Sequence, residues 1–139
     1  MSDPVRGLVL AHASLAQAMI SAARRISGAD EEALAALTNE GCGPDSLLAN
    51  VRAALGDAPA IVFTDLGSGS CAFAARRVLL DRPQTGLVCG VNLPILLDFV
   101  FHRDLPLQAL VDRLVEKGRQ GVSGACAPTE ADADRTAAR

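Results

Sequence analysis

Four short apolar segments, each followed by a stretch with helical apolar spacing, constrain the fold of this chain most strongly. The apolar segments lie at residues 7–11, in the later part of 32–37, at 60–64 and at 85–90. The helical patterns lie at residues 14–26, 44–55, 71–81, 92–103 and 105–121. Residues 32–37 (EALAAL) are ambiguous on propensity alone, and the alternating order favours a strand. This alternation predicts an α/β fold with a parallel sheet covered by helices on both faces.

The length of the chain sets the number of domains. With 139 residues, of which 50% are apolar, the chain can bury one substantial core but not two. We therefore expect a single domain over residues 1–126, followed by a polar tail at 127–139 that we expect to be disordered. Because there is no Trp or Tyr and only four Phe, the core must be mainly aliphatic.

Charge and hydropathy exclude several classes of partner. The formal net charge is −3 and no long run of either sign occurs, which argues against binding to nucleic acid or directly to anionic membrane. No apolar stretch approaches the roughly 20 residues of a membrane span, and the first residues, MSDPVRG, lack a signal-peptide pattern. We expect a cytoplasmic protein.

The cysteines Cys42, Cys71, Cys89 and Cys126 are spread singly, without a C-x-x-C pair. This spacing indicates neither a zinc site nor a disulfide framework, and buried or bystander thiols are the default interpretation. Cys71 is the exception to watch, because it adjoins a glycine loop, and a helix N-terminus there would lower the pKa of its thiol.

Two predicted strand ends carry the residues with chemical potential. Ala11-His12-Ala13-Ser14 follows the first strand, and Thr64-Asp65-Leu66-Gly67-Ser68-Gly69-Ser70 follows the third. Ligands of open α/β sheets bind beyond the carboxyl ends of the strands, where the strand order reverses. If the strand order is the flavodoxin-like 2-1-3-4 of a doubly wound sheet, His12 and Asp65 open onto one crevice.

A histidine facing a carboxylate has a specific chemical meaning. The carboxylate fixes the imidazole tautomer and stabilises the charge that the ring develops, which leaves the other nitrogen free to attack. If the attacked group is a phosphoryl, the backbone amides of Ser68, Gly69 and Ser70 and the Ser70 hydroxyl are candidate donors to its oxygens.

Two other interpretations of the glycine loop exist. In the first, His12 and Asp65 are ordinary loop or capping residues and the glycines only form a turn. In the second, the loop binds a nucleotide or methyl donor. This cofactor hypothesis lacks support in the sequence, because Cys71 stands where a third glycine is required and the fourth strand ends without an acid for the ribose.

Four segments in order, GLVLAHASLAQAMISAARRISG, AIVFTDLGSGSCAFAARRVLL, LVCGVNLPILLDFV and ALVDRLVEKGRQGV, resemble the mannose-family IIA components of the bacterial phosphoenolpyruvate-dependent sugar phosphotransferase system. The resemblance implies that His12 carries a phosphoryl group, that Asp65 opens the glycine loop and that Ser70 begins the next helix. It also implies that the group comes from the phosphocarrier HPr and passes to a IIB component, without metal or cofactor.

The same resemblance implies a homodimer that exchanges a C-terminal antiparallel strand, for which residues 121–125 (GVSGA) are the candidate. Contact with a membrane would be indirect, through a permease complex. Gly67, Ser68 and Cys71 depart from the usual loop of the family, and Ala13 follows the histidine where glycine is common. These departures leave open a phosphorylation-dependent regulatory module without sugar transport, the related subunit of dihydroxyacetone kinase, or a non-catalytic domain.

Overall fold

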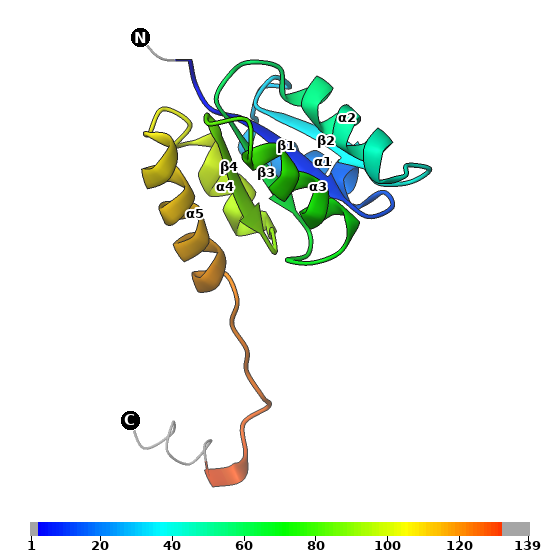
Figure 1. Ribbon diagram of the computed structural model, residues 1–139. Helices are drawn as coiled ribbons and strands as arrows, with labels where there is room; N and C mark the ends of the chain where they lie inside the picture. The colour runs from blue at the N-terminus through cyan, green and yellow to red at the C-terminus, as the bar shows by residue number, and fades with distance from the viewer. Residues whose placement is uncertain (1–2, 132–139) are drawn as a thin grey trace.

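The computed structural model describes residues 3–131 and consists of one sheet flanked by helices (Figure 1). The strands are β1 (Arg6–Ala11), β2 (Leu34–Thr38), β3 (Ala60–Thr64) and β4 (Thr85–Cys89). The helices are α1 (Leu15–Ser27), α2 (Pro44–Leu55), α3 (Ser70–Leu79), α4 (Leu93–Val100) and α5 (Leu107–Gln120).

The four strands are parallel and lie in the order β2-β1-β3-β4. The predicted doubly wound α/β fold and its strand order 2-1-3-4 are therefore confirmed. Ala11 pairs with Thr38 of β2, and Leu10 pairs with Thr64 of β3. This register brings the carboxyl ends of β1, β2 and β3 to one edge of the sheet, where the loops that follow them meet.

Each face of the sheet has its own apolar layer. Buried residues of α1, α4 and α5 pack on one face, and buried residues of α2 and α3 pack on the other (Figure 1). Because β3 is covered on both sides, all five of its residues are buried, which explains its continuous apolar sequence. Phe63 of β3 and Phe99 of α4 meet edge to face with ring centroids 5.2 Å apart.

Two predicted helices end earlier than their sequence patterns. The helix predicted at 71–81 covers Ser70–Leu79, because the amides of Leu80 and Asp81 bond to carbonyls three residues back and close a turn. The helix predicted at 92–103 ends at Val100. His102 lies just beyond that end, and its Nδ1 donates to the Asp98 carbonyl at 2.7 Å.

The GVNLP segment fastens α4 to α5. Asn92 caps α4 by accepting a hydrogen bond from the Ile95 amide at 3.1 Å. Its side-chain nitrogen donates to the carbonyl of Gly118 in α5 at 3.0 Å. A single side chain therefore fixes both the start of α4 and the position of the C-terminal helix beside it.

Beyond α5 the chain leaves the body of the protein (Figure 1). Residues 122–129 form neither strand nor helix, so residues 121–125 are not a strand within a single chain. The predicted exchange of this segment would require a second copy. Of the predicted tail at 127–139, residues 132–139 lie outside the described part. Among the described residues, no helix has both the length and the apolar character needed to cross a membrane.

Candidate functional site

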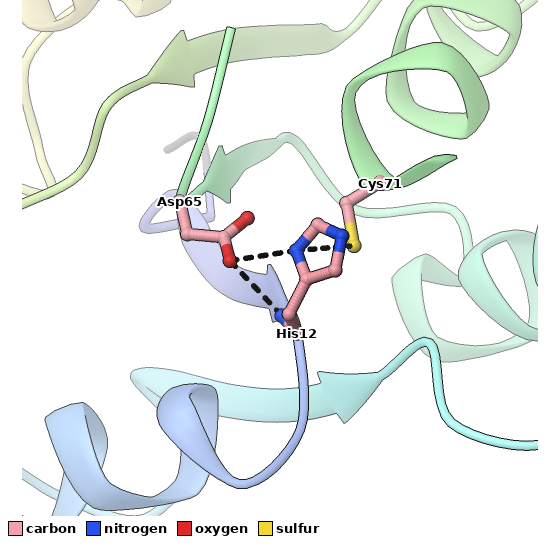
Figure 2. A group of neighbouring side chains, drawn as sticks. All are labelled: His12, Asp65 and Cys71. Carbon is pink, nitrogen blue, oxygen red and sulfur yellow. Dashed lines mark hydrogen bonds and ion pairs between the residues drawn. The ribbon is translucent and has the colours of Figure 1, made fainter. Parts of the chain in front are cut away.

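His12 and Asp65 contact each other where β1 and β3 end (Figure 2). Oδ2 of Asp65 lies 2.8 Å from Nδ1 of the imidazole and also accepts the His12 backbone amide at 3.0 Å. One carboxylate oxygen therefore holds both the ring and the main chain of His12. The His12 side chain is 42% exposed and that of Asp65 is 10% exposed, so the ring projects to the surface above a nearly buried acid.

Hydrogen bonds keep Asp65 ionised. Burial disfavours the carboxylate, but the His12 amide, the hydrogen bond from the ring and the attraction of a charged ring together hold the pKa of Asp65 below its usual value. The ionised oxygen beside Nδ1 favours the tautomer that carries its proton on Nδ1. In the described part of the chain no group bonds to Nε2, which leaves that nitrogen's lone pair available.

The loop that carries Asp65 is held by its own neighbours. The Leu66 amide donates to Oδ1 of Asp65 at 3.0 Å, and the Thr64 hydroxyl donates to the Leu66 carbonyl at 2.8 Å. Arg76 reaches back from α3 and donates to the Gly67 carbonyl at 2.9 Å. Three bonds therefore restrain a glycine-rich segment that would otherwise move freely.

The three predicted phosphoryl-binding residues occupy different positions. Gly69 precedes α3 with φ at +91°, a conformation that favours glycine, and a Cβ there would lie 4.0 Å from Cε1 of His12. Ser70 is the first residue of α3, so its amide is one of the unpaired donors of the helix start. Ser68 is exposed and makes no hydrogen bond within the described residues.

The turn after His12 carries backbone strain. Ala13 has φ at +54°, in the left-handed region that residues with a Cβ rarely adopt. The Thr38 hydroxyl of β2 donates to the Ala13 carbonyl at 2.8 Å and holds this turn in place. Strain of this kind often occurs at functional sites, where the surrounding structure maintains it.

Two further residues lie at the site: Cys71, which the sequence singled out beside the glycine loop, and Asn39, which was not predicted. Cys71 in the first turn of α3 places its Sγ 3.9 Å from Nδ1 of His12. Asn39 follows β2 and donates from its side chain to the Ser70 hydroxyl at 3.3 Å. The position of Asn39 after a strand was the signal that could have found it, because β2 ends at the same edge as β1.

For Cys71, the sequence indicated the burial but not the direction of the pKa shift. The residue is fully buried, as the default interpretation held. The expectation that the helix N-terminus would lower the thiol pKa is wrong. Burial raises the pKa of Cys71, and the nearby charge of Asp65 raises it further, whereas the Ser70 side chain acts in the opposite direction.

Three large apolar side chains on the segments that follow β1 and β3 are exposed. Leu66 is 56% exposed and follows Asp65 directly, and Phe73 is 59% exposed one turn into α3. Leu15, at the start of α1, is 42% exposed. Large exposed apolar side chains that gather in one patch are typical of a surface that contacts another protein.

The strand-end histidine, its carboxylate and the glycine loop all lie within the part of the chain that matches a known family. The model of the EIIA-man family, described as PTS system fructose IIA component, matches residues 7–117. The chain belongs to this family. It is thus a IIA component of the phosphotransferase system at family level, as the resemblance of the sequence indicated. A comparison with curated proteins gave no match.

Several solved structures share the fold of this chain. The mannose/sorbose-specific IIA subunit from Enterococcus faecalis is 23% identical in sequence and superposes with a TM-score of 0.79. The match covers 91% of this chain and 98% of the Enterococcus chain. An EIIA component from Streptococcus agalactiae is 18% identical and has the same TM-score of 0.79. This match covers 86% of the present chain and 96% of the Streptococcus chain. A protein from E. faecalis described as a sigma-54 interaction domain protein is 14% identical, with a TM-score of 0.69 and coverage of 86% and 94%.

Proposed function

We propose that the protein carries a phosphoryl group on His12, which it accepts from phospho-HPr and passes to a IIB component of a mannose-type sugar phosphotransferase system. The observation that carries this proposal is the 2.8 Å contact between Nδ1 of His12 and the carboxylate of Asp65. This contact fixes the proton on Nδ1 and leaves Nε2 as a nucleophile on a surface that a donor protein can reach.

In the transfer step, the lone pair of Nε2 attacks the phosphorus atom of phospho-HPr. The bond from phosphorus to the donor breaks as the bond to Nε2 forms, and the donor keeps the electron pair of the broken bond. The His12 ring gains positive charge, and the adjacent Asp65 carboxylate offsets this charge while Nδ1 retains its proton. The second transfer, to the IIB component, reverses these roles and restores neutral His12.

The start of α3 supplies donors for the phosphoryl oxygens. Within the described residues the amides of Gly69, Ser70 and Cys71 donate no hydrogen bond to protein, and they stand at the N-terminus of a ten-residue helix beside the ring. Unpaired amides and the helix dipole favour an anion at this position. Because the site is open, it can stabilise the phosphoryl group without preventing onward transfer.

The exposed apolar residues of the loop after β3 and of α3 support docking of the donor and the acceptor at one place. Leu66 and Phe73 flank the glycine loop, and Arg77 lies over the Phe73 ring with its guanidinium carbon 6.0 Å from the ring centroid. A small apolar surface with a cation at its side suits transient association better than permanent association. Partners that bind in turn to such a surface can each reach Nε2.

A homodimer is the proposed assembly. β4 is an edge strand of the sheet, and a groove of about 300 Å³ lies at its carboxyl end, lined in part by Gly90, Asn92 and Val122. An unpaired edge strand accepts a further strand readily. The segment at 121–125 leads away from its own sheet, and we propose that it pairs antiparallel with β4 of a second copy.

A regulatory role is the second candidate function. It is favoured by the similarity in fold to the E. faecalis protein described as a sigma-54 interaction domain protein. In this case His12 would still be phosphorylated, and its state would control binding to a regulator in place of transfer to a IIB component. The two functions differ only after the first step, so a IIB acceptor distinguishes them.

The proposal is tested by incubating the protein with phosphoenolpyruvate, enzyme I and HPr. We expect one acid-labile, base-stable phosphate per chain in the wild type and none in His12→Ala. Mass spectrometry of the base-stable product should place the phosphate on His12. Labelling that persists in His12→Ala would overturn the assignment of the residue, and an unlabelled wild type with cognate partners would overturn phosphoryl transfer.

Two variants separate chemistry from folding in the same assay. Asp65→Asn keeps the shape of the side chain but removes the charge beside the ring, so labelling should slow by about 10- to 100-fold, the range for residues that orient a reactive histidine. Asp81→Asn is the matched control, because Asp81 is exposed and pairs only with Arg52. Its rate of labelling should equal that of the wild type.

A further inference from the structure

Three side chains that each carry a potential metal ligand meet at the end of the sheet (Figure 2). His12 follows β1, Asp65 follows β3 and Cys71 lies in the first turn of α3. One ligand atom from each side chain lies within 4.8 Å of the other two. The family-level role uses the imidazole and the carboxylate, and it assigns no function to the thiol.

The donor set matches the preferences of zinc. Thiolate, imidazole and carboxylate are the three protein ligands that Zn²⁺ takes in proteins, and a thiolate disfavours Mg²⁺ and Ca²⁺. A thiolate and a carboxylate supply two negative charges, so a divalent cation with a neutral imidazole gives a complex without net charge. A neutral complex is suited to a position between the nearly buried Asp65 and the fully buried Cys71.

Two of the three ligand distances require only small movements, whereas the distance from Asp65 to Cys71 Sγ lies within 4.8 Å and must reach about 3.6 Å. In a tetrahedral site with the usual zinc bond lengths, the imidazole nitrogen lies about 3.4 Å from a carboxylate oxygen and about 3.6 Å from a sulfur. The corresponding distances from Nδ1 are 2.8 Å to Asp65 Oδ2 and 3.9 Å to Cys71 Sγ. The first must open and the second must close by a few tenths of an ångström. The partly exposed His12 ring can supply this movement.

We propose that His12 Nδ1, Asp65 and Cys71 form a binding site for Zn²⁺, with a water molecule as the fourth ligand. The cation takes the place of the proton between Nδ1 and Asp65. Bonds form from zinc to Nδ1, to the carboxylate oxygen and to sulfur. The Cys71 thiol releases its proton to solvent, because a coordinating thiol is deprotonated by the metal.

Occupation of this site blocks the proposed phosphoryl transfer, and this consequence rests on the proposed function. A neutral imidazole carries one proton, so a metal on Nδ1 places that proton on Nε2. Nε2 then has no lone pair with which to attack phosphorus. The metal also engages the carboxylate that would stabilise the charged ring. Zinc and the phosphoryl group are therefore mutually exclusive occupants of the site.

Binding is tested without any phosphoryl donor, with Co²⁺ as an optical probe for the zinc site. Co²⁺ should give one thiolate-to-metal charge-transfer band per chain, and Zn²⁺ should displace it. Cys71→Ala and Cys71→Ser should lose the band and weaken Zn²⁺ binding by about tenfold or more, because the soft ligand is gone. Cys89→Ser and Cys126→Ser are the matched controls and should retain both. A band that persists in Cys71→Ala, or that disappears in a control, would overturn the site.

Folding and function are then separated by two further measurements. Zn²⁺ should raise the melting temperature of the wild type and leave that of Cys71→Ala unchanged, and circular dichroism without metal shows whether the variants fold. Zn²⁺ should inhibit labelling of the wild type by phospho-HPr at concentrations that leave Cys71→Ala labelled. Equal inhibition of both would overturn the block. If neither protein is labelled without zinc, the proposed function fails while the optical result still decides the metal site.

Discussion

At the scale of single residues, Asp65 sets the state of the site because it contacts both the backbone and the ring of His12. Its pKa lies below the ordinary value, so the carboxylate is charged throughout the neutral range. In the proposed transfer, charge on this acid, more than the intrinsic basicity of imidazole, decides which nitrogen of His12 acts as the nucleophile. The site is therefore prepared for reaction before any partner arrives.

The lowered pKa of Asp65 predicts a pH dependence of stability. Because the folded-state pKa is lower than that of the unfolded chain, near 3.8, the ionised carboxylate contributes stability above that value. This contribution is lost as the pH falls through the folded-state pKa. Urea unfolding of wild type and Asp65→Asn between pH 7 and pH 3 should show a constant difference at first. The wild type should then lose its relative advantage in acid, whereas a difference that stays constant to pH 3 would contradict the lowered pKa.

Ala13 predicts an unusual gain from a glycine substitution. Left-handed backbone costs a residue with a Cβ about 1–2 kcal/mol, and glycine costs about 0.5–1 kcal/mol through the entropy of the unfolded chain. Ala13→Gly should therefore raise the free energy of unfolding by about 0.5 kcal/mol. Ala53→Gly, at an exposed site within α2, should lower it by about 1 kcal/mol. Chemical denaturation measures both, and a loss at Ala13 equal to that at Ala53 would show that the turn is unstrained.

The sequence was sufficient to predict that the residues at two strand ends come together, but not where the residues next to them lie. His12 and Asp65 could be paired because parallel strands end at the same edge. Cys71 could not be placed, because its direction depends on the angle at which α3 leaves the glycine loop. The predicted direction of its pKa shift was wrong for a related reason. The influence of a helix N-terminus follows from the position of a residue in the sequence, whereas burial depends on the packing of the whole layer.

At the scale of elements, α4 and α5 are joined by polar contacts as well as by apolar packing. Asp98 of α4 pairs with Arg113 of α5 at 2.8 Å, and Asn92 bonds to Gly118. Gly118 is required at this crossing, because a Cβ there would lie 2.6 Å from the Ile95 side chain. The GVNLP segment is thus a structural joint between helices. Sequence patterns located both helices, but spacing along one helix does not show which residues of another helix it meets.

Replacement of Asn92 by alanine tests this joint. Asn92→Ala removes the cap of α4 and the bond to α5, so the free energy of unfolding should fall by about 2 kcal/mol. Asn50→Ala is the control, because Asn50 is exposed in α2 and donates only to the Cys42 sulfur at 3.5 Å. Denaturation should show a change below about 0.5 kcal/mol for the control. Equal effects of the two substitutions would contradict the role of Asn92 as a joint.

At the scale of the whole molecule, the chain places its reactive residues at one edge of the sheet and its C-terminal segment beyond α5. The alternation of strands and helices predicted a parallel sheet, because right-handed crossovers connect parallel strands through helices. The order 2-1-3-4 was the flavodoxin-like one among several that this alternation allows. Assembly was not predictable in the same way. A strand exchanged between copies pairs with residues of another molecule, so the pattern within one chain cannot locate its partner.

Truncation tests the proposed dimer. A chain that ends at Gly121 should be monomeric and folded, because the described part of the removed segment, residues 122–131, contributes nothing to either apolar layer. A chain that ends at Thr129 keeps residues 121–125 and should remain a dimer. Sedimentation velocity at equal concentrations compares the two. A dimer that survives truncation at Gly121 would contradict strand exchange, and so would a full-length protein that is monomeric at every concentration.

The oxygen of Asp65 that serves both the ring and the backbone amide of His12 links the chemistry of the site to the main chain. When the ring gains charge, its hydrogen bond to that oxygen strengthens, and less of the oxygen's electron density remains for the amide. The hydrogen bond of the His12 amide should therefore weaken when the ring is modified. The proton chemical shift of this amide should report the modification in solution, without any label on the phosphoryl group.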